Sequence, residues 1–498
     1  MPENKWDLVI RSASIYDGSG APPIEGDVAI KGDRIGAVGV VKGTSLREID
    51  ARGRALAPGF IDVHSHDDFA LFISPEMEFK TMQGVTTDVV GNCGLGASPY
   101  RTATSMFASM RNSGSVPAWE GYAGYLDTID RNPPSLNVTV LVGHGSIRHG
   151  AMGNADRKPD DREFAQMRKW LREALEAGAV GLSTGLIYEP GRYAQTEEII
   201  ALAREMATVG GLYASHMRDE AGGLLDSIRE TIRIGEEAAV PIQISHHKAS
   251  GRENWGKVRE SLRLIDEARA RGLDVTADQY PYTSGSTILA AVLQNGALDE
   301  VPHGAMGHVP GDKVLFASMP RHHEREGMTL KQLCDQWGVN DRTGAERIVA
   351  EEGGDAVVIV GTMDEADVRT VMRHPTTMIG SDGIAAGSRP HPRLYGTFPR
   401  VLGHYARDER LMSVAEAVHR MTGMPAEKFK LAERGFVRAG YFADLVIFDP
   451  ATIADLGTYE NPRQYPSGLS HVFVNGTAIV ADGQHTGARP GRALRRGK

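Results

Sequence analysis

Hydrophobic and polar residues follow two different patterns along this chain. In the first fifty residues, short apolar runs such as Leu8-Val-Ile and Val28-Ala-Ile are separated by glycine turns, a pattern typical of β-strands. The same pattern returns near the end of the chain, where Asn475-Gly476 indicates a tight turn. We therefore predict one small β-sandwich domain that is built from both ends of the chain, residues 1–56 and 433–498.

Between these ends, short apolar runs alternate with amphipathic helical patterns. Phe164, Met167 and Leu171, for example, keep one apolar face at helical spacing. Eight such alternations predict a parallel (β/α)8 TIM-like barrel, an α/β fold, over residues 57–432. Its strands are expected to begin at Gly59, Val85, Val138, Val180, Leu212, Ile242, Leu273 and Thr377. A ninth run at Ala356 makes the count ambiguous, and we expect an insertion over about 286–347, a length typical of a lid.

Composition and charge narrow the class of protein. The 498 residues are 41% hydrophobic and 24% charged, with a net charge of −9, which excludes a disordered chain and disfavours nucleic acid or an anionic membrane as the partner. Two cysteines, Cys93 and Cys334, are too few for a disulfide framework, and we interpret Cys334 as a core residue. We therefore expect a cytoplasmic protein that acts on a small molecule; its oligomeric state is left open.

Polar residues collect at the carboxyl ends of the predicted strands, which form the catalytic rim of such a barrel. His64 and His66 follow the first strand and, being two apart, point to the same side. Cys93 follows the second strand between glycines, and His216 and His246 end two consecutive strands. Taken singly, each of these is more often a structural residue. A thiolate together with imidazoles matches Zn²⁺ better than Mg²⁺ or Ca²⁺.

Further polar residues at this rim indicate acid–base chemistry and anion binding. Asp382 lies in Gly380-Ser-Asp-Gly; opposite a metal, such a carboxylate could take a proton from water and pass it to a leaving group. Lys248 and Arg393 are either solvated rim charges or a clamp for a substrate carboxylate. Tyr280 and Ser286 could add hydroxyl donors, although the repeated tyrosines and serines around them leave their register open.

Taken in order, these motifs resemble the amidohydrolase superfamily, and within it the N-acyl-D-amino-acid deacylases (D-aminoacylases). The resemblance covers essentially the whole chain. It is carried by Ala57-Pro-Gly-Phe-Ile-Asp-Val-His-Ser-His, Gly91-Asn-Cys-Gly, Ile244-Ser-His-His-Lys, Gly380-Ser-Asp-Gly and His391-Pro-Arg-Leu-Tyr-Gly-Thr-Phe-Pro-Arg. Many superfamily members bridge two metals with a carboxylated lysine on the fourth strand, whereas Val180-Gly-Leu-Ser-Thr-Gly-Leu contains no lysine. The D-aminoacylase branch is similar in using a strand-two cysteine.

The resemblance implies a zinc-dependent enzyme that hydrolyses the amide bond of N-acyl-D-amino acids to a carboxylate and a free D-amino acid. By motif, Cys93, His216 and His246 would hold a tight zinc. His64 and His66 would serve a second, weaker site.

The resemblance also implies roles for the remaining rim residues. Asp382 would be the catalytic acid and base. The substrate carboxylate would be gripped by Lys248, Tyr280, Ser286 and Arg393. The 286–347 insertion resembles the family's lid segment.

Two rival functions account for part of the same pattern. Gly181-Leu-Ser183-Thr-Gly185 matches the nucleophile elbow of serine hydrolases, but Pro190-Gly191 blocks the helix that should follow directly. Another activity of the same superfamily would keep the metal, either as a cyclic amide hydrolase of the dihydroorotase or hydantoinase type or as a deacylase selective for N-acyl-D-glutamate. The preferred side chain and acyl group, the chirality and the number of metals are not decided by the residues alone.

Overall fold

The central feature of the fold is a sheet of eight parallel strands, seen in a computed structural model that describes residues 6–106, 108, 114–299 and 304–497. In spatial order the strands are β6 (Phe60–Asp62), β7 (Val85–Val90), β8 (Asn137–Gly143), β9 (Gly181–Gly185), β10 (Leu212–His216), β11 (Ile242–Ile244), β12 (Val275–Gln279) and β16 (Thr377–Ile379). Each coincides with one of the eight predicted runs. A parallel bridge between Ser65 and Gly383 brings the two edges of the sheet together, so the predicted (β/α)8 barrel is confirmed as a nearly closed barrel.

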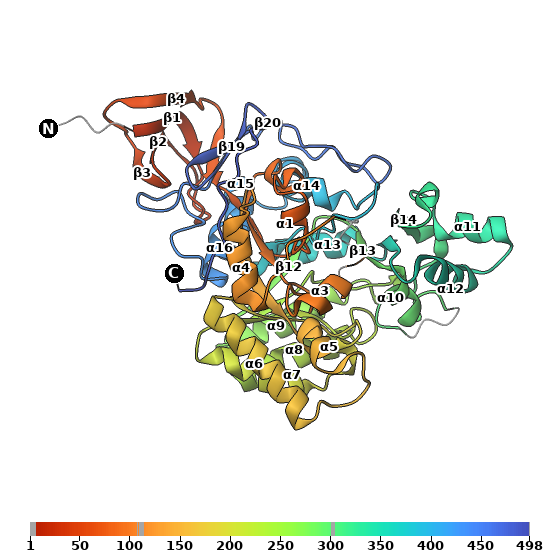
Figure 1. Ribbon diagram of the computed structural model, residues 1–498. Helices are drawn as coiled ribbons and strands as arrows, with labels where there is room; N and C mark the ends of the chain where they lie inside the picture. The colour runs from red at the N-terminus through yellow and green to blue at the C-terminus, as the bar shows by residue number, and fades with distance from the viewer. Residues whose placement is uncertain (1–5, 107, 109–113, 300–303, 498) are drawn as a thin grey trace.

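Helices cover the outside of this barrel (Figure 1). The longer ones are α4 (Gly121–Arg131), α5 (His144–Met152), α6 (Asp161–Ala177), α7 (Thr196–Ala207), α8 (Leu224–Ala238), α9 (Val258–Ala270) and α13 (Glu365–Arg373). Shorter ones are α1 (Ala70–Ile73), α2 (Glu78–Thr81), α3 (Tyr100–Met106), α14 (Arg393–Arg400), α15 (Val414–Met421) and α16 (Gly423–Lys428).

Helix α6 shows how local sequence sets these elements. It begins at a capping box in which Asp160 accepts a hydrogen bond from the Glu163 backbone N–H and Glu163 accepts one from the Asp160 backbone N–H. It ends at Gly178, whose φ of 111° closes the helix in the left-handed conformation that glycine adopts without strain. The predicted apolar face is buried at Met167 and Leu171, and burial of each such side chain contributes about 1.5–3 kcal/mol.

Strands from both ends of the chain form a single nine-stranded sheet. The N-terminal strands are β1 (Trp6–Ile15), β2 (Ile24–Lys31), β3 (Arg34–Gly39), β4 (Ser45–Asp50) and β5 (Ala55–Pro58); the C-terminal strands are β17 (Leu445–Phe448), β18 (Leu469–Val474), β19 (Thr477–Ala481) and β20 (Gln484–His485). The two sets join where β17 pairs antiparallel with β5. Only Gly59 separates β5 from the first barrel strand, so this β domain is attached directly to the barrel.

A smaller unit projects from the barrel between β12 and β16 (Figure 1). Its three strands, β13 (Ser284–Ile288), β14 (Val314–Ser318) and β15 (Val357–Gly361), pair in the order β13-β15-β14 and are accompanied by α10 (Leu289–Gln294), α11 (Leu330–Trp337) and α12 (Asp341–Glu352). The apolar run at Ala356 leads into β15, so it belongs to this unit and not to the barrel. We call residues 284–361 the insertion unit. Cys334 lies in its core with 1% of its surface exposed.

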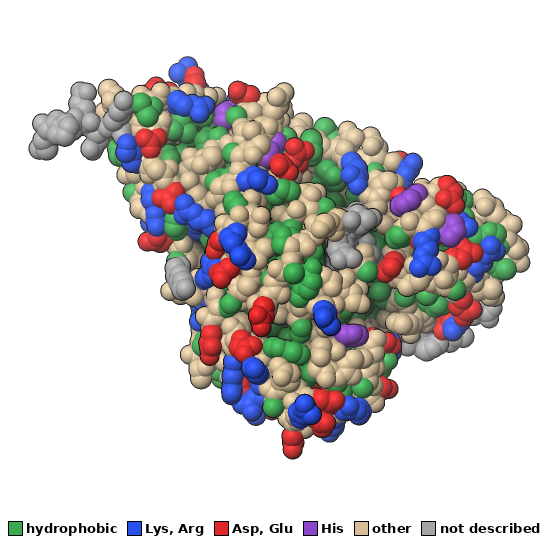
Figure 2. Space-filling model, in the orientation of Figure 1, with side chains coloured by type: hydrophobic (Ala, Val, Ile, Leu, Met, Phe, Trp, Pro, Cys, Tyr) green, Lys and Arg blue, Asp and Glu red, His purple; other side chains and the backbone are tan. Residues whose placement is uncertain are grey.

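The molecular surface carries charges of both signs. Lysine, arginine, aspartate and glutamate side chains are mixed over the face shown in Figure 2. In the described ranges, none of the helices combines the length and the apolar character needed to cross a membrane.

Candidate metal centre and active site

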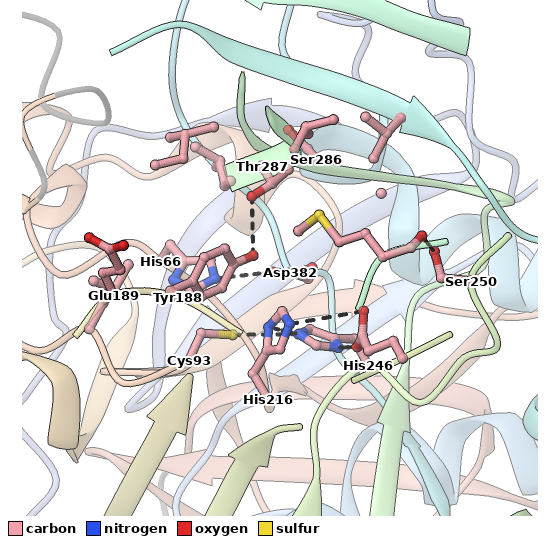
Figure 3. A pocket seen from close by; sticks show the side chains of 18 of the residues that line it. His66, Cys93, Tyr188, Glu189, His216, His246, Ser250, Ser286, Thr287 and Asp382 are labelled. Carbon is pink, nitrogen blue, oxygen red and sulfur yellow. Dashed lines mark hydrogen bonds and ion pairs between the residues drawn. The ribbon is translucent and has the colours of Figure 1, made fainter. Parts of the chain in front are cut away.

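The carboxyl ends of the barrel strands open into a cavity of about 460 Å³, a size usual for a small-molecule site (Figure 3). Eight of the predicted site residues line it: His66, Cys93, His216, His246, Lys248, Tyr280, Ser286 and Asp382. The other two, His64 and Arg393, are fully buried and contact residues of this set, as described below. The structure therefore brings all ten predicted residues together.

The Cys93 sulfur lies at the centre of a group of imidazoles (Figure 3). Its Sγ atom is 3.2 Å from His64 Nε2 and 3.5 Å from His246 Nε2. His216 Nδ1 lies 2.8 Å from the same His246 nitrogen. Burial alone would raise the pKa of the Cys93 thiol, but the positive charge of the surrounding imidazoles, His64 first, holds this pKa well below its usual value. The group therefore favours a thiolate.

The loop that carries Cys93 is held against strand β9 by Ser183. The Ser183 hydroxyl donates a hydrogen bond to the Gly91 carbonyl and accepts one of 3.1 Å from the Gly94 backbone N–H. Gly185 permits the contact, because a Cβ there would lie 2.1 Å from the Cys93 carbonyl oxygen. Ser183 is thus a buried loop anchor, and its hydroxyl is committed to backbone partners, which disfavours the serine-hydrolase alternative.

Two buried carboxylates orient the imidazoles. Glu220 Oε1 lies 3.0 Å from His246 Nδ1, and Asp278 Oδ1 lies 3.2 Å from His64 Nδ1. In both rings Nε2 faces Cys93, the orientation in which histidines bind metals. Burial alone would raise the pKa of Glu220, but Lys248 and the imidazoles lower it, so Glu220 is ionised and accepts a hydrogen bond from Lys248 Nζ.

The donor set fits a metal ion of the zinc type. Buried imidazoles normally satisfy both ring nitrogens, yet in the described part of the chain His216 Nε2 and His66 Nδ1 have no hydrogen-bond partner. One thiolate and several imidazoles from separate strands are the ligands of zinc sites, and catalytic sites keep a position open for water. His64, Cys93 and His246 can all place one donor atom within 4.8 Å of one another, and so can His64, His66 and Asp382.

Asp382 lies between the imidazoles and a buried arginine. Its Oδ1 is 3.1 Å from His66 Nε2 and 3.5 Å from His64 Nε2, and its Oδ2 is 3.0 Å from Arg393 Nη2. Burial alone would raise the pKa of Asp382, but Arg393 and then His64 hold it well below its usual value. Asp382 is therefore ionised and can accept a proton from a water molecule at the centre.

Three site residues occupy the left-handed backbone region, which non-glycine residues rarely adopt. The φ angles are 53° at Cys93, 35° at His246 and 49° at Asp382. Each such residue costs about 1–3 kcal/mol. Hydrogen bonds hold two of them in place: the Asp382 backbone N–H donates to the His64 carbonyl at 2.7 Å, and the His246 N–H donates to Asp278 at 2.8 Å. The fold thus maintains strained turns where it presents its reactive side chains.

The four residues predicted to grip a carboxylate lie at or beside the cavity, and the two cations among them have different partners. Lys248 Nζ is 2.6 Å from Glu220 Oε1, so its charge is already paired. Arg393 is fully buried and packs 4.4 Å from the Tyr280 ring. Its Nε and Nη1 atoms have no hydrogen-bond partner among the described residues, which leaves two donors for an anion. Ser286 lines the same cavity.

The two tyrosines of the tyrosine-rich turn have different surroundings. Tyr280 lines the cavity, whereas the Tyr282 hydroxyl donates to Asp455 at 3.4 Å. His247, beside a candidate ligand, contacts the Ser261 hydroxyl at 2.7 Å instead.

Glu220 and Asp278 contact the candidate ligands His246 and His64 and were not predicted from the sequence. Glu220 is the fourth residue after His216, and this short spacing between a carboxylate and a candidate ligand could have indicated it. Asp278 lies inside strand β12, where nothing in the local pattern distinguishes it.

Comparison with known proteins agrees with this geometry. Residues 47–480 match the profile of the Amidohydrolase family. The D-aminoacylase of Alcaligenes xylosoxydans xylosoxydans is 40% identical, over 99% of this chain and 98% of that protein, and the N-acyl-D-glutamate deacylase of the same organism is 39% identical, over 99% and 97%. The structure is also similar to a crystal structure of N-acyl-D-glutamate deacylase from Bordetella bronchiseptica, which is complexed with zinc and a phosphonate mimic of the tetrahedral intermediate. The two superimpose with a TM-score of 0.88 at 38% sequence identity, over 99% of this chain and 100% of that one. The chain therefore belongs to the amidohydrolase family and, within it, to the D-aminoacylase family.

Proposed function

We propose that this protein is a zinc-dependent deacylase that hydrolyses the amide bond of N-acyl-D-amino acids to a carboxylate and a free D-amino acid. The observation that carries the proposal is the convergence of Cys93, His64, His216 and His246 opposite the ionised Asp382. The names of the relatives support both the metal and the D configuration of the substrate.

The ligand roles are those that the resemblance to the D-aminoacylases implies, and the proximity of the five side chains supports them. Cys93, His216 and His246 would hold the tight zinc, and His64 and His66 a second, weaker one. Bound zinc supplies a water molecule of lowered pKa and polarises an amide carbonyl.

The chain's own side chains then move the protons. Asp382 accepts a proton from the attacking water at Oδ1 and returns it to the nitrogen of the leaving amine. Its backbone is fixed by the hydrogen bond to the His64 carbonyl, so the carboxylate meets the water in one orientation.

Four residues position the substrate through its α-carboxylate. Arg393 offers its two unpartnered donors, and Lys248, Tyr280 and Ser286 line the cavity beside it. A substrate carboxylate bound by these four residues directs the amide group toward the metal centre, and amides without a carboxylate are excluded. A cyclic amide without this carboxylate would miss the grip, which favours linear N-acyl amino acids over hydantoins.

We further propose a cytoplasmic location. Both cysteines are buried free thiols, and Cys93 must stay reduced to bind metal. A reducing compartment supports both requirements.

The test combines metal analysis with a substrate screen on the purified protein. We expect bound zinc, turnover of N-acetyl-D-amino acids, little turnover of the L enantiomers or of hydantoins, and loss of activity when a chelator removes the metal. Turnover confined to L substrates, or activity that survives complete removal of metal, would overturn the proposal. Ser183→Ala alone is a poor test, because Ser183 also anchors the Cys93 loop.

A further inference from the structure

A second cavity lies at the end of the barrel opposite the metal centre, toward the amino ends of strands β8 and β9. Its volume is about 200 Å³. Thr139 of β8 and Val180, which directly precedes β9, form part of its wall. The rest of the wall comes from the segment after α16 and from residues 492–496, which we call the C-terminal tail. The end of the chain accordingly lies next to α16 in Figure 1.

The lining of this cavity is strongly basic. Its described residues include no aspartate or glutamate but five cations: Lys430, Arg434, Arg492, Arg495 and Arg496. Three of the five already have carboxylate partners outside the lining: Arg434 pairs with Asp444, Arg492 with Asp33, and Arg495 with Asp127 and Asp130.

The other two cations, Lys430 and Arg496, are held by backbone carbonyl groups alone. Lys430 Nζ donates a hydrogen bond to the Gly210 carbonyl at 2.8 Å, and the Arg496 guanidinium donates to three backbone carbonyls of the barrel. Neither side chain forms an ion pair within the described ranges, so both positive charges lack a counter-charge. A cleft lined by charges of one sign concentrates ions of the opposite sign.

A buried hydroxyl group in the same cavity lacks a partner. Thr139 has no exposed surface, and its Oγ1 atom forms no hydrogen bond with any described residue. Buried hydroxyl groups are normally hydrogen-bonded, and this one lines the basic cavity. The hydroxyl can therefore donate to a ligand that enters there.

An ammonium group, a guanidinium group and a hydroxyl group together suit a phosphate group, which offers negative charge and several acceptor oxygens. We propose that this cavity binds a phosphate group, at a site separate from the active site. The cavity is smaller than the roughly 300–1,000 Å³ of sites for drug-sized ligands, which favours inorganic phosphate over a phosphorylated metabolite. Bound phosphate would join β8, the segment after α16 and the C-terminal tail through Thr139, Lys430 and Arg496.

The test is calorimetric titration of the zinc-loaded enzyme with sodium phosphate, with sodium chloride at equal ionic strength as the control for screening. We expect one phosphate to bind. Because a ligand of the folded state stabilises it, phosphate should also raise the melting temperature and slow hydrogen exchange in the C-terminal tail. Turnover should not change, because none of these residues contacts the metal centre.

Variants locate the bound phosphate. Lys430→Gln and Thr139→Val should each weaken binding about tenfold. Lys169→Gln, at an exposed lysine outside the lining, should leave it unchanged. Thr139→Val keeps the volume of the side chain and removes a hydroxyl without a partner, so its melting temperature without phosphate should be at least that of the wild type.

Two results would overturn the proposal. One is the absence of phosphate binding to the wild-type enzyme. The other is binding that raises KM and persists unchanged in both Lys430→Gln and Thr139→Val, which would place the phosphate at the active site. A parallel titration with glycerol phosphate identifies the source of the group. Tighter binding of this ester, with the same loss in Lys430→Gln, would assign the cavity to a phosphorylated metabolite.

Discussion

Replacing Lys80 by methionine should destabilise the protein strongly. Lys80, in helix α2, is fully buried. Its Nζ atom lies 2.5 Å from Asp62 Oδ2, 3.1 Å from Asp67 Oδ2 and 2.7 Å from the Ser381 hydroxyl. Asp62 precedes His64 and His66 on the first barrel strand, and Ser381 precedes Asp382 after the last. One ammonium group therefore joins the two edges of the barrel directly below the site.

The magnitude follows from burial. Lys80→Met keeps the aliphatic stem but leaves Asp62 and Asp67, both with no exposed surface, without their counter-charge. Removing one partner of a buried ion pair lowers the free energy of unfolding by about 3–5 kcal/mol. Lys169 is a matched control, because exposed ion pairs contribute only about 0–1 kcal/mol. Its Nζ atom lies 3.8 Å from Glu173 Oε1, and its side chain is 66% exposed.

The assay is thermal unfolding of the purified variants, together with zinc content and turnover. We expect a clearly lower melting temperature for Lys80→Met and almost no decrease for Lys169→Met. In the double variant Lys80→Met with Asp62→Asn, the melting temperature should recover in part, because one of the unpaired buried carboxylates is removed. Asp62 also accepts hydrogen bonds from the backbone N–H groups of His64 and Ser381, so turnover should fall with stability. A Lys80→Met protein as stable as the wild type would refute the reasoning.

Three further predictions concern the site, the thiols and pH. Asp382→Asn should lower kcat about 100-fold or more with little change in KM, because proton transfer contributes about 10²–10⁴-fold; unchanged turnover in steady-state kinetics would remove Asp382 from the mechanism. In the metal-free enzyme at pH 8, iodoacetamide should modify Cys93 but not Cys334, since burial raises the pKa of Cys334 to about 11 and leaves about one thiolate in a thousand. Zinc should protect Cys93, and mass spectrometry that finds Cys334 modified first would contradict this. Burial lowers the pKa of Lys428 from 10.5 to about 8. Between pH 8 and pH 10.5 the unfolded chain therefore binds more protons at this group than the folded chain does. The contribution of Lys428 to the free energy of unfolding rises over this range, by up to about 3 kcal/mol. Lys428→Met should weaken the rise in melting temperature from pH 8 to pH 10, and identical profiles would argue against it.

Hydrophobic patterning predicted the barrel because each of its strands is buried on both faces and each long helix on one. That burial produces the eight apolar runs and the apolar helical face at Met167 and Leu171. The run at Ala356 could not be assigned in the same way, because a buried strand has the same local pattern in any sheet. Only its pairing with β13 and β14 places it in the insertion unit.

The candidate ligands were predictable because parallel strands present their carboxyl ends at one rim, so residues distant in sequence meet there. The residues that support these ligands could not be predicted from the sequence. Asp278 and Lys80 act through neighbours that tertiary packing brings to them. The left-handed backbone at Cys93 and Asp382 is likewise imposed by the surrounding fold and has no signature in the residue type.

The junction of β5 with β17 has a consequence for biosynthesis. Ala55 leaves the ribosome long before Phe448, the residue it pairs with, and at ordinary translation rates the interval is on the order of tens of seconds. During that interval the nascent half-sheet has an open edge on which another chain could dock. Synthesis of β17 is the step that covers this edge, so a chain truncated before Leu445 would keep the edge of β5 open and be prone to aggregation.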